Sequence, residues 1–144
     1  MERLQALYRY LTLVLVVDIA LQFFLAGAGV FRAHGPKPAR DSSAFDPHRA
    51  NGDAVMIVAL LVFLTALAAR NRRWRVALPL TVLAAVQTPL SIAGWAGGLH
   101  PLNGLLITAL AAFLAHDAWA GARRAAHSAN GTASSTGGPG GRSA

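Results

Sequence analysis

Residues 11–31 read LTLVLVVDIALQFFLAGAGVF, and Asp18 is the only charged residue among them. A helix needs about 20 mostly apolar residues to cross a bilayer, with a tolerated range of about 17–25. Three further apolar runs follow in the 144-residue chain. The sequence therefore predicts an all-α fold, an integral membrane four-helix bundle. Its expected spans are about 8–31, 51–69, 76–96 and 101–120.

The composition agrees with a membrane protein and excludes several kinds of site. Hydrophobic residues make up 54% of the chain and charged residues 13%, whereas soluble domains carry about 25% charged residues. The absence of cysteine excludes disulfides, thiolate metal ligands and cysteine nucleophiles. The formal charge of +7 comes from arginines clustered at the ends of the runs, with no basic face of interleaved aromatic residues. We therefore expect no nucleic-acid partner.

The same arginines predict the orientation of the chain. Short cytoplasmic loops are rich in Lys and Arg. The N-terminal segment, the link 70–75 and the segment after the fourth run hold eight of these residues, and the opposite loops hold four. Both termini are therefore predicted to be cytoplasmic. The segment 125–144 is rich in Gly, Ser and Ala, so we expect a disordered tail after a membrane domain at 1–124.

The motif His-x-x-Asn-Gly occurs twice, as HRANG at 48–52 and as HPLNG at 100–104. Each copy lies at the start of an apolar run. A glutamine followed by small residues precedes each copy, Gln22 before the first and Gln87 before the second. This pattern predicts two tandem helical hairpins related by an axis along the membrane normal. Chance similarity between two hydrophobic segments is the alternative.

The two motif histidines are the candidates for a cofactor site. The dipole at a helix N-terminus disfavours imidazolium, and a neutral imidazole offers a lone pair to a metal. Two neutral rings facing each other across an apolar cleft suit a b-type haem. We predict a haem or metal site between His48 and His100, with Asn51 and Asn103 orienting a ring nitrogen or binding a propionate. Alternatively, both histidines only begin helices.

Four other polar residues are predicted to lie within the membrane. They are Asp18 and Gln22 in the first span, and Gln87 and Ser91 in the third, each pair one helical turn apart. An ionisable group at that depth costs about 2.5–3.5 kcal/mol and usually faces the bundle interior. The pattern predicts a polar seam between the first and third spans that serves a proton, an ion or a propionate. Hydrogen bonds that only hold the helices together are the alternative.

The strings QFFLAG at 22–27, FDPHR at 45–49 and HPLNG at 100–104 resemble domain-of-unknown-function family 6220, a group of small four-span membrane proteins from high-GC bacteria. The resemblance extends over about residues 8–120. It implies a multi-pass protein of the bacterial cell membrane and no particular activity. More loosely, the hairpins are similar to those of haem A synthases and other b-type cytochromes. Those proteins place their haem ligands deeper in the helix than His48 and His100.

Two functional hypotheses follow from the sequence. The first is a membrane protein that binds b haem for electron transfer or redox sensing. The second is a non-catalytic subunit or scaffold that packs against another membrane protein or another copy of this chain. Small residues support it because they allow close helix packing; they are Gly27, Gly29, Gly94, Gly97 and Gly98. The sequence shows no nucleophile–base pair and no carboxylate pair, so nothing assigns an enzyme activity.

Overall fold

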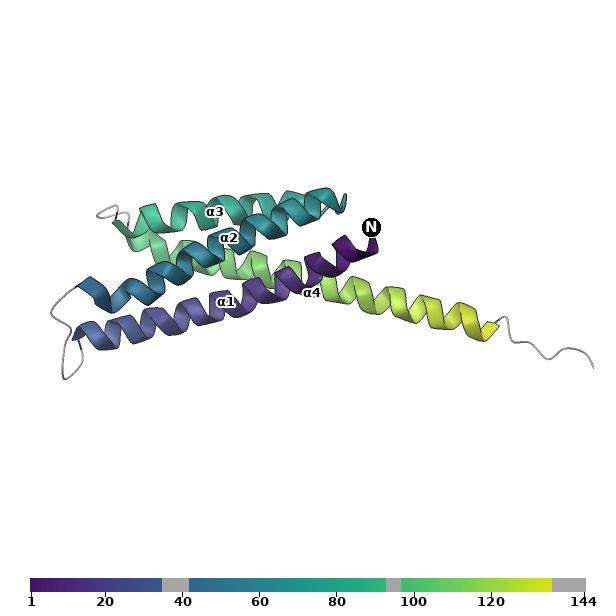
Figure 1. The fold of residues 1–144 in the computed structure, drawn as a ribbon, viewed down its shortest axis with the longest axis horizontal. Coiled ribbons are helices and arrows are strands. Elements are labelled where there is room, and N and C mark those ends of the chain that lie inside the picture. Colours follow the sequence, from purple (N-terminus) through teal and green to yellow (C-terminus); the bar gives the residue numbers. More distant parts are fainter. Residues whose placement is uncertain (35–41, 93–96, 136–144) are drawn as a thin grey trace, which may run out of the picture.

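The computed structural model describes residues 1–34, 42–92 and 97–135, and every element in these ranges is a helix. In chain order they are α1 (Glu2–His34), the 3-10 helix η1 (Ser42–Phe45), α2 (Asp46–Ala68), α3 (Trp74–Ile92) and α4 (Leu99–Ser135) (Figure 1). Helices suit such apolar sequences because they satisfy all their backbone hydrogen bonds within the segment. The predicted all-α fold is confirmed.

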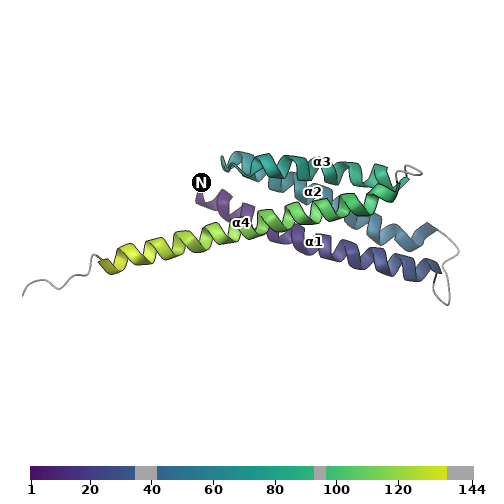
Figure 2. The same ribbon diagram turned by 180° about the vertical axis from the view of Figure 1, so that it is seen from behind.

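The four long helices form a closed ring. α1 packs against α2, α2 against α3, α3 against α4, and α4 against α1, as the two opposite views show (Figures 1 and 2). Among the described residues, the backbone of α1 does not come close to that of α3, nor the backbone of α2 to that of α4. These two pairs therefore lie diagonally across the bundle, and the hairpins α1–α2 and α3–α4 lie side by side.

The buried core repeats from one hairpin to the other. The first helix of each hairpin buries positions spaced i, i+3 and i+7, and the second helix buries positions spaced i, i+4 and i+7, so each set lies on one helical face. The first pattern comprises Thr12, Leu15 and Ile19 in α1, and Ala77, Leu80 and Ala84 in α3. The second comprises Val55, Ala59 and Val62 in α2, and Ile107, Ala111 and Leu114 in α4. The predicted tandem hairpins therefore share one internal packing scheme.

Among the described residues, three helices are long and apolar enough to cross a membrane: α1, the segment Ser43–Ala68 with α2, and α4 as far as Ser128. They correspond to the first, second and fourth predicted spans. The third predicted span ends in residues 93–96, which lie outside the described residues, so it stays a prediction beyond Ile92. Large apolar side chains cover the outer surface of the helices; Phe24 and Phe31 are each 70% exposed.

Two helix ends differ from what the sequence suggests. Asp46, followed by proline, has the pattern of an N-cap, but the capping position is Phe45 and no side chain caps the helix. Asp46 instead accepts a 2.8 Å hydrogen bond from Arg49. At the other end, the predicted disordered tail from 125 is helical as far as Ser135. The alanines that follow Gly121 favour helix and explain this extension. The remainder of the tail, 136–144, lies outside the described residues.

The link between α2 and α3 begins with a strained residue. Arg70 has a φ of 50°, in the left-handed region that favours glycine. The N–H of Arg70 donates to the carbonyl of Leu67 at 3.0 Å, and the N–H of Asn71 donates to that of Ala66 at 2.9 Å. These bonds end α2 by satisfying its last carbonyls. They also turn the chain sharply into the arginine-rich link at the end of the bundle opposite the two motifs.

Candidate functional site

The polar residues of both motifs lie at one end of the bundle, in two matching groups. The first group contains Gln22 of α1 with His48 and Asn51 of α2. The second contains Gln87 of α3 with His100 and Asn103 of α4. The hydrogen bonds therefore run within each hairpin, between its first and second helix. They do not form the predicted seam between the first and third spans, because α1 and α3 lie diagonally.

In the first group, one glutamine binds both polar motif side chains. The Asn51 amide donates to the backbone carbonyl of Asp18 at 3.1 Å and to Oε1 of Gln22 at 2.8 Å. Nε2 of Gln22 lies 3.4 Å from Nε2 of His48. Nδ1 of His48 lies 3.2 Å from the backbone carbonyl oxygen of Gln22. Asn51 thus acts on the histidine through Gln22 and not on a ring nitrogen directly.

The second group repeats these contacts. The Asn103 amide donates to the backbone carbonyl of Leu83 at 2.9 Å and also to Oε1 of Gln87. Nε2 of Gln87 lies 3.3 Å from Nε2 of His100 and donates to the His100 carbonyl at 3.0 Å. Nδ1 of His100 lies 2.9 Å from the backbone carbonyl oxygen of Gln87. Asp18 and Leu83 therefore occupy equivalent positions, and both contribute a backbone carbonyl.

The glycine of each motif also lies against the glutamine side chain. A Cβ on Gly52 would lie 3.2 Å from Nε2 of Gln22, and one on Gly104 would lie 3.4 Å from Nε2 of Gln87. Positions i, i+3 and i+4 of a helix share one face. The spacing His-x-x-Asn-Gly therefore places three contacts with one glutamine on the first turns of the following helix. The sequence signalled the glutamine and the motif separately, but not that they touch.

The hydrogen-bond network favours the same tautomer in both rings. A backbone carbonyl oxygen can only accept, so each histidine must donate from Nδ1. The carbonyls of Asp18 and Leu83 likewise fix the asparagine amides, which in turn direct each glutamine Oε1 toward asparagine and its Nε2 toward histidine. The glutamine Nε2 can only donate, so histidine Nε2 must accept. These contacts are all satisfied when His48 and His100 carry a hydrogen on Nδ1 and a lone pair on Nε2.

A cavity of about 480 Å³ lies between the two groups. The ring centroids of His48 and His100 are 6.2 Å apart across the bundle axis, and their planes meet at 65°. Four buried aliphatic residues that line the cavity come one from each long helix: Ile19, Val55, Ala84 and Ile107. The walls include both glutamines, both histidines and both motif glycines. The two hairpins thus contribute equivalent residues to one apolar cavity.

The two halves of the cavity differ in charge and size at a few positions. Arg49 lines the first half at the position that Pro101 occupies in the second. Likewise, Phe23 in the first hairpin is equivalent to Thr88 in the second. Ser91 also lines the cavity, and its hydroxyl donates to the carbonyl of Thr88 at 2.7 Å. Two predicted site residues, Asn51 and Asn103, and the predicted intramembrane Asp18 are not among the lining residues. The asparagines instead hold the glutamine side chains by donating to their Oε1 atoms.

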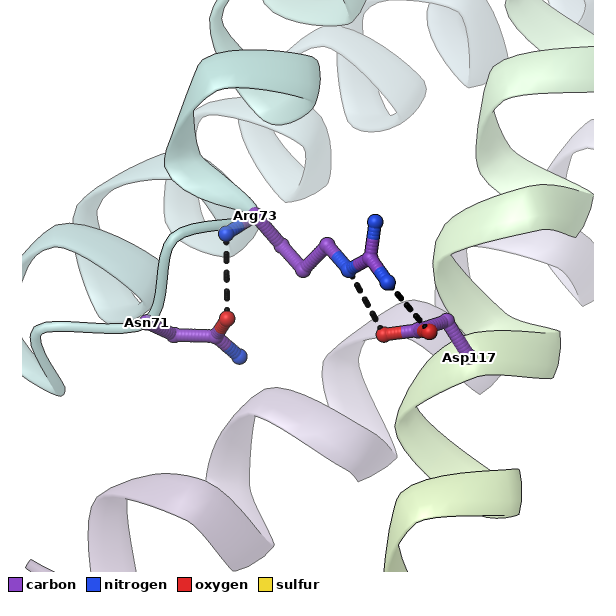
Figure 3. A network of polar contacts seen from close by, with 3 residues as sticks. All are labelled: Asn71, Arg73 and Asp117. Carbon is purple, nitrogen blue, oxygen red and sulfur yellow. Dashed lines mark hydrogen bonds and ion pairs between the residues drawn. The ribbon is translucent and has the colours of Figure 1, made fainter.

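A second polar cluster lies at the opposite end of the bundle (Figure 3). Arg73 donates to both carboxylate oxygens of Asp117, from Nε at 2.7 Å and from Nη2 at 2.5 Å. Oδ1 of Asn71 accepts from the backbone N–H of Arg73 at 3.0 Å. This bidentate pair ties the link between α2 and α3 to α4. The sequence predicted only that these arginines lie in a cytoplasmic link, and it did not indicate that Arg73 pairs with Asp117.

Comparisons with known proteins support one family. No curated protein and no solved structure matches the chain. Residues 22–91 match the model of a family of unknown function (DUF6220). The match begins at Gln22, includes His48 and Asn51, and ends before the second motif. The resemblance to this family that the sequence predicted over about residues 8–120 is therefore confirmed for residues 22–91.

Proposed function

We propose that this protein binds b-type haem between His48 and His100 in the bacterial cell membrane, and that it passes electrons or responds to redox state. The hydrogen bonds of the two histidine rings are the main support for the proposal. Metal-ligating histidines donate their other ring N–H to a carboxylate, a carbonyl or water, and both rings here donate Nδ1–H to a backbone carbonyl. Each Nε2 lone pair accepts a long hydrogen bond, of 3.3–3.4 Å, from a glutamine amide, and a bound haem iron would replace this contact.

The surroundings favour haem over a bare metal ion. A structural metal site needs about four protein ligands, and the described residues contain no group of three or more His, Asp or Glu able to hold an ion. Haem iron needs only axial ligands from the protein, so a pair of histidines is sufficient. The cavity of about 480 Å³ is within the usual range of about 300–1,000 Å³ for small-ligand pockets. When bound, haem supplies one-electron chemistry.

A difference spectrum, reduced minus oxidised, tests the proposal on the purified full-length protein with and without added haem. We expect a Soret band that is lost in His48→Ala and in His100→Ala. His116→Ala is the matched control, because His116 lies on α4 with His100 but is exposed and more than four turns away. Helicity by circular dichroism separates loss of haem from loss of fold. A wild-type protein that gains no Soret band with haem would refute the proposal.

A second candidate function, a scaffold for another membrane protein or a second copy, is supported by the outer face of α1. A Cβ on Gly27 would meet no atom within 4 Å, and Phe31, one turn later in α1, is 70% exposed. Gly29 does not belong to this face, because a Cβ there would lie 2.6 Å from the Phe45 ring. Gly94 lies outside the described residues. For this second function we also propose cytoplasmic termini, because the arginines concentrate on the side of the membrane that holds both termini.

The association state in detergent distinguishes the scaffold from the haem protein. A Gly27→Leu variant should lose association without changing the haem spectrum, because Gly27 does not line the cavity. Gly98→Leu is the comparison variant, since a Cβ on Gly98 also meets nothing within 4 Å. A wild-type protein that purifies alone and monomeric would contradict the scaffold function.

A further inference from the structure

The arginine-rich end of the bundle contains a second cavity, of about 750 Å³. It lies between the first turns of α1, the link after α2, and the part of α4 that leaves the bundle (Figure 1). Arg3 and Arg9 line it. The N-terminal segment, the link 70–75 and residues 123–124 bring eight arginines to this end, against the carboxylates of Glu2 and Asp117. The cavity therefore lies in a strongly positive part of the molecule.

One buried side chain on this cavity lacks a partner. Tyr8 lines the cavity and is only 1% exposed. In the part of the chain that the structure describes, its hydroxyl has no hydrogen-bond partner. A buried hydroxyl without a partner is unfavourable, and native structures rarely leave one. An acceptor supplied by a bound molecule would satisfy it.

The charges around the cavity favour an anion. The carboxylate of Asp117 lines it, but Arg73 already holds both of its oxygens. The guanidinium of Arg9 lies 6.0 Å from the centroid of the Trp119 ring, which holds this cation beside α4. Glu2 is the remaining acidic residue on the cavity, and Arg3 lies next to it in the chain. Two arginines are therefore available to a bound anion.

We propose that this cavity binds the phosphate of an anionic phospholipid headgroup. Arg3 and Arg9 would pair with the phosphate, and the Tyr8 hydroxyl would donate to one of its oxygens. Apart from Asp117, the α4 residues on the cavity are alanines and Gly121, and a Cβ on Gly121 would meet nothing within 4 Å, so the cavity has room for a headgroup. Basic pockets between membrane helices are suited to acidic lipids. This site is independent of the haem cavity.

The test titrates purified full-length protein in neutral detergent with dihexanoyl phosphatidylglycerol, dihexanoyl phosphatidylcholine and sodium phosphate, observed by ³¹P NMR and native mass spectrometry. We expect phosphatidylglycerol to bind more than tenfold tighter than the other two. Tyr8→Phe should weaken its binding about tenfold, the usual effect of one hydrogen bond to a charged group. Arg3→Gln and Arg9→Gln should weaken binding and reduce its salt dependence. Arg124→Gln, a surface arginine of α4 off the cavity, should leave binding unchanged.

A stability measurement separates lost binding from lost folding. Without lipid, Tyr8→Phe should melt at the wild-type temperature or above, because the variant removes an unpartnered buried hydroxyl. Ala122→Leu should block the cavity and abolish lipid binding. Equal binding of the two lipids would overturn the proposal, as would wild-type affinity in Tyr8→Phe. Sodium phosphate binding as tightly as phosphatidylglycerol would overturn the lipid as the source of the phosphate.

Discussion

Gln22 contacts both ring nitrogens of His48: its side-chain Nε2 lies 3.4 Å from Nε2, and its backbone carbonyl oxygen lies 3.2 Å from Nδ1. Gln87 makes the same two contacts with His100, at 3.3 Å and 2.9 Å. One residue therefore fixes both the orientation and the tautomer of each ring. This relationship, present once in each hairpin, explains why a glutamine precedes each His-x-x-Asn-Gly motif.

The first prediction concerns the histidine tautomers. In the ligand-free protein at neutral pH, ¹⁵N NMR of the imidazole nitrogens should show His48 and His100 as neutral rings protonated on Nδ1, because only this form satisfies both glutamine contacts. The exposed His116, which lies outside both glutamine groups, provides the comparison. Finding either motif histidine protonated on Nε2 would refute the hydrogen-bond assignment.

The second prediction concerns the glutamines. Gln22→Leu and Gln87→Leu each remove the partner of an asparagine amide and a histidine ring, so each should lower the free energy of unfolding by about 1–3 kcal/mol. The loss should be larger for Gln87→Leu, because Asn103 is only 6% exposed and its amide is harder to solvate. Unfolding in mixed micelles measures this. Ser91→Ala, on an exposed residue of α3, should change stability by less than about 0.5 kcal/mol; an equally large effect there would contradict a specific role for the glutamines.

The third prediction concerns three helical glycines. Gly→Ala inside a helix normally stabilises it by about 0.5–1 kcal/mol. Gly121→Ala should show this gain, because its Cβ meets nothing within 4 Å. Gly52→Ala should lose the gain and shift the His48 ring signals, because its Cβ would lie 3.2 Å from the Gln22 amide. Gly104→Ala, with 3.4 Å to Gln87, should fall between them. Equal stabilisation in all three variants would exclude close glutamine packing.

The fourth prediction concerns the ion pair at the arginine-rich end. A double-mutant cycle of Arg73→Gln and Asp117→Asn should give a coupling energy of about 1 kcal/mol, since the pair is bidentate but partly solvated. The side chains are 38% and 27% exposed. The pair of Arg49 and Asp46, with side chains 58% and 63% exposed, should give about 0.3 kcal/mol or less. High salt should reduce both. Similar values for the two cycles would contradict the role of partial burial.

The fifth prediction concerns the strained end of α2. Arg70 holds a φ of 50°, and a residue with a side chain loses about 1–2 kcal/mol in that region. Arg70→Gly should therefore raise the thermal midpoint, with part of the gain offset by the greater flexibility of glycine when unfolded. Arg70→Lys keeps both the charge and the strain, so it should melt like the wild type. A lower midpoint in Arg70→Gly would show that the arginine side chain itself stabilises the turn.

The sequence predicted more of the fold than of the site. The apolar runs located α1, α2 and α4 because the length of an apolar segment is a local property. The repeated motif correctly pointed to tandem hairpins. The tail was predicted to be disordered from its composition, but the helix preference of its alanines extends α4 as far as Ser135. The predicted seam joined α1 to α3 because a sequence does not state which helices of a bundle are neighbours.

The helical, apolar character of this chain can be read from its sequence, as can the correspondence of Gln22, His48 and Asn51 with Gln87, His100 and Asn103. How these residues meet depends on the packing of the helices. The ring order of the helices makes α2 and α4 diagonal, so the two histidines face each other across the axis and not within a hairpin. Backbone carbonyls of α1 and α3 then fix the tautomers, because their positions depend on how each helix packs on the next.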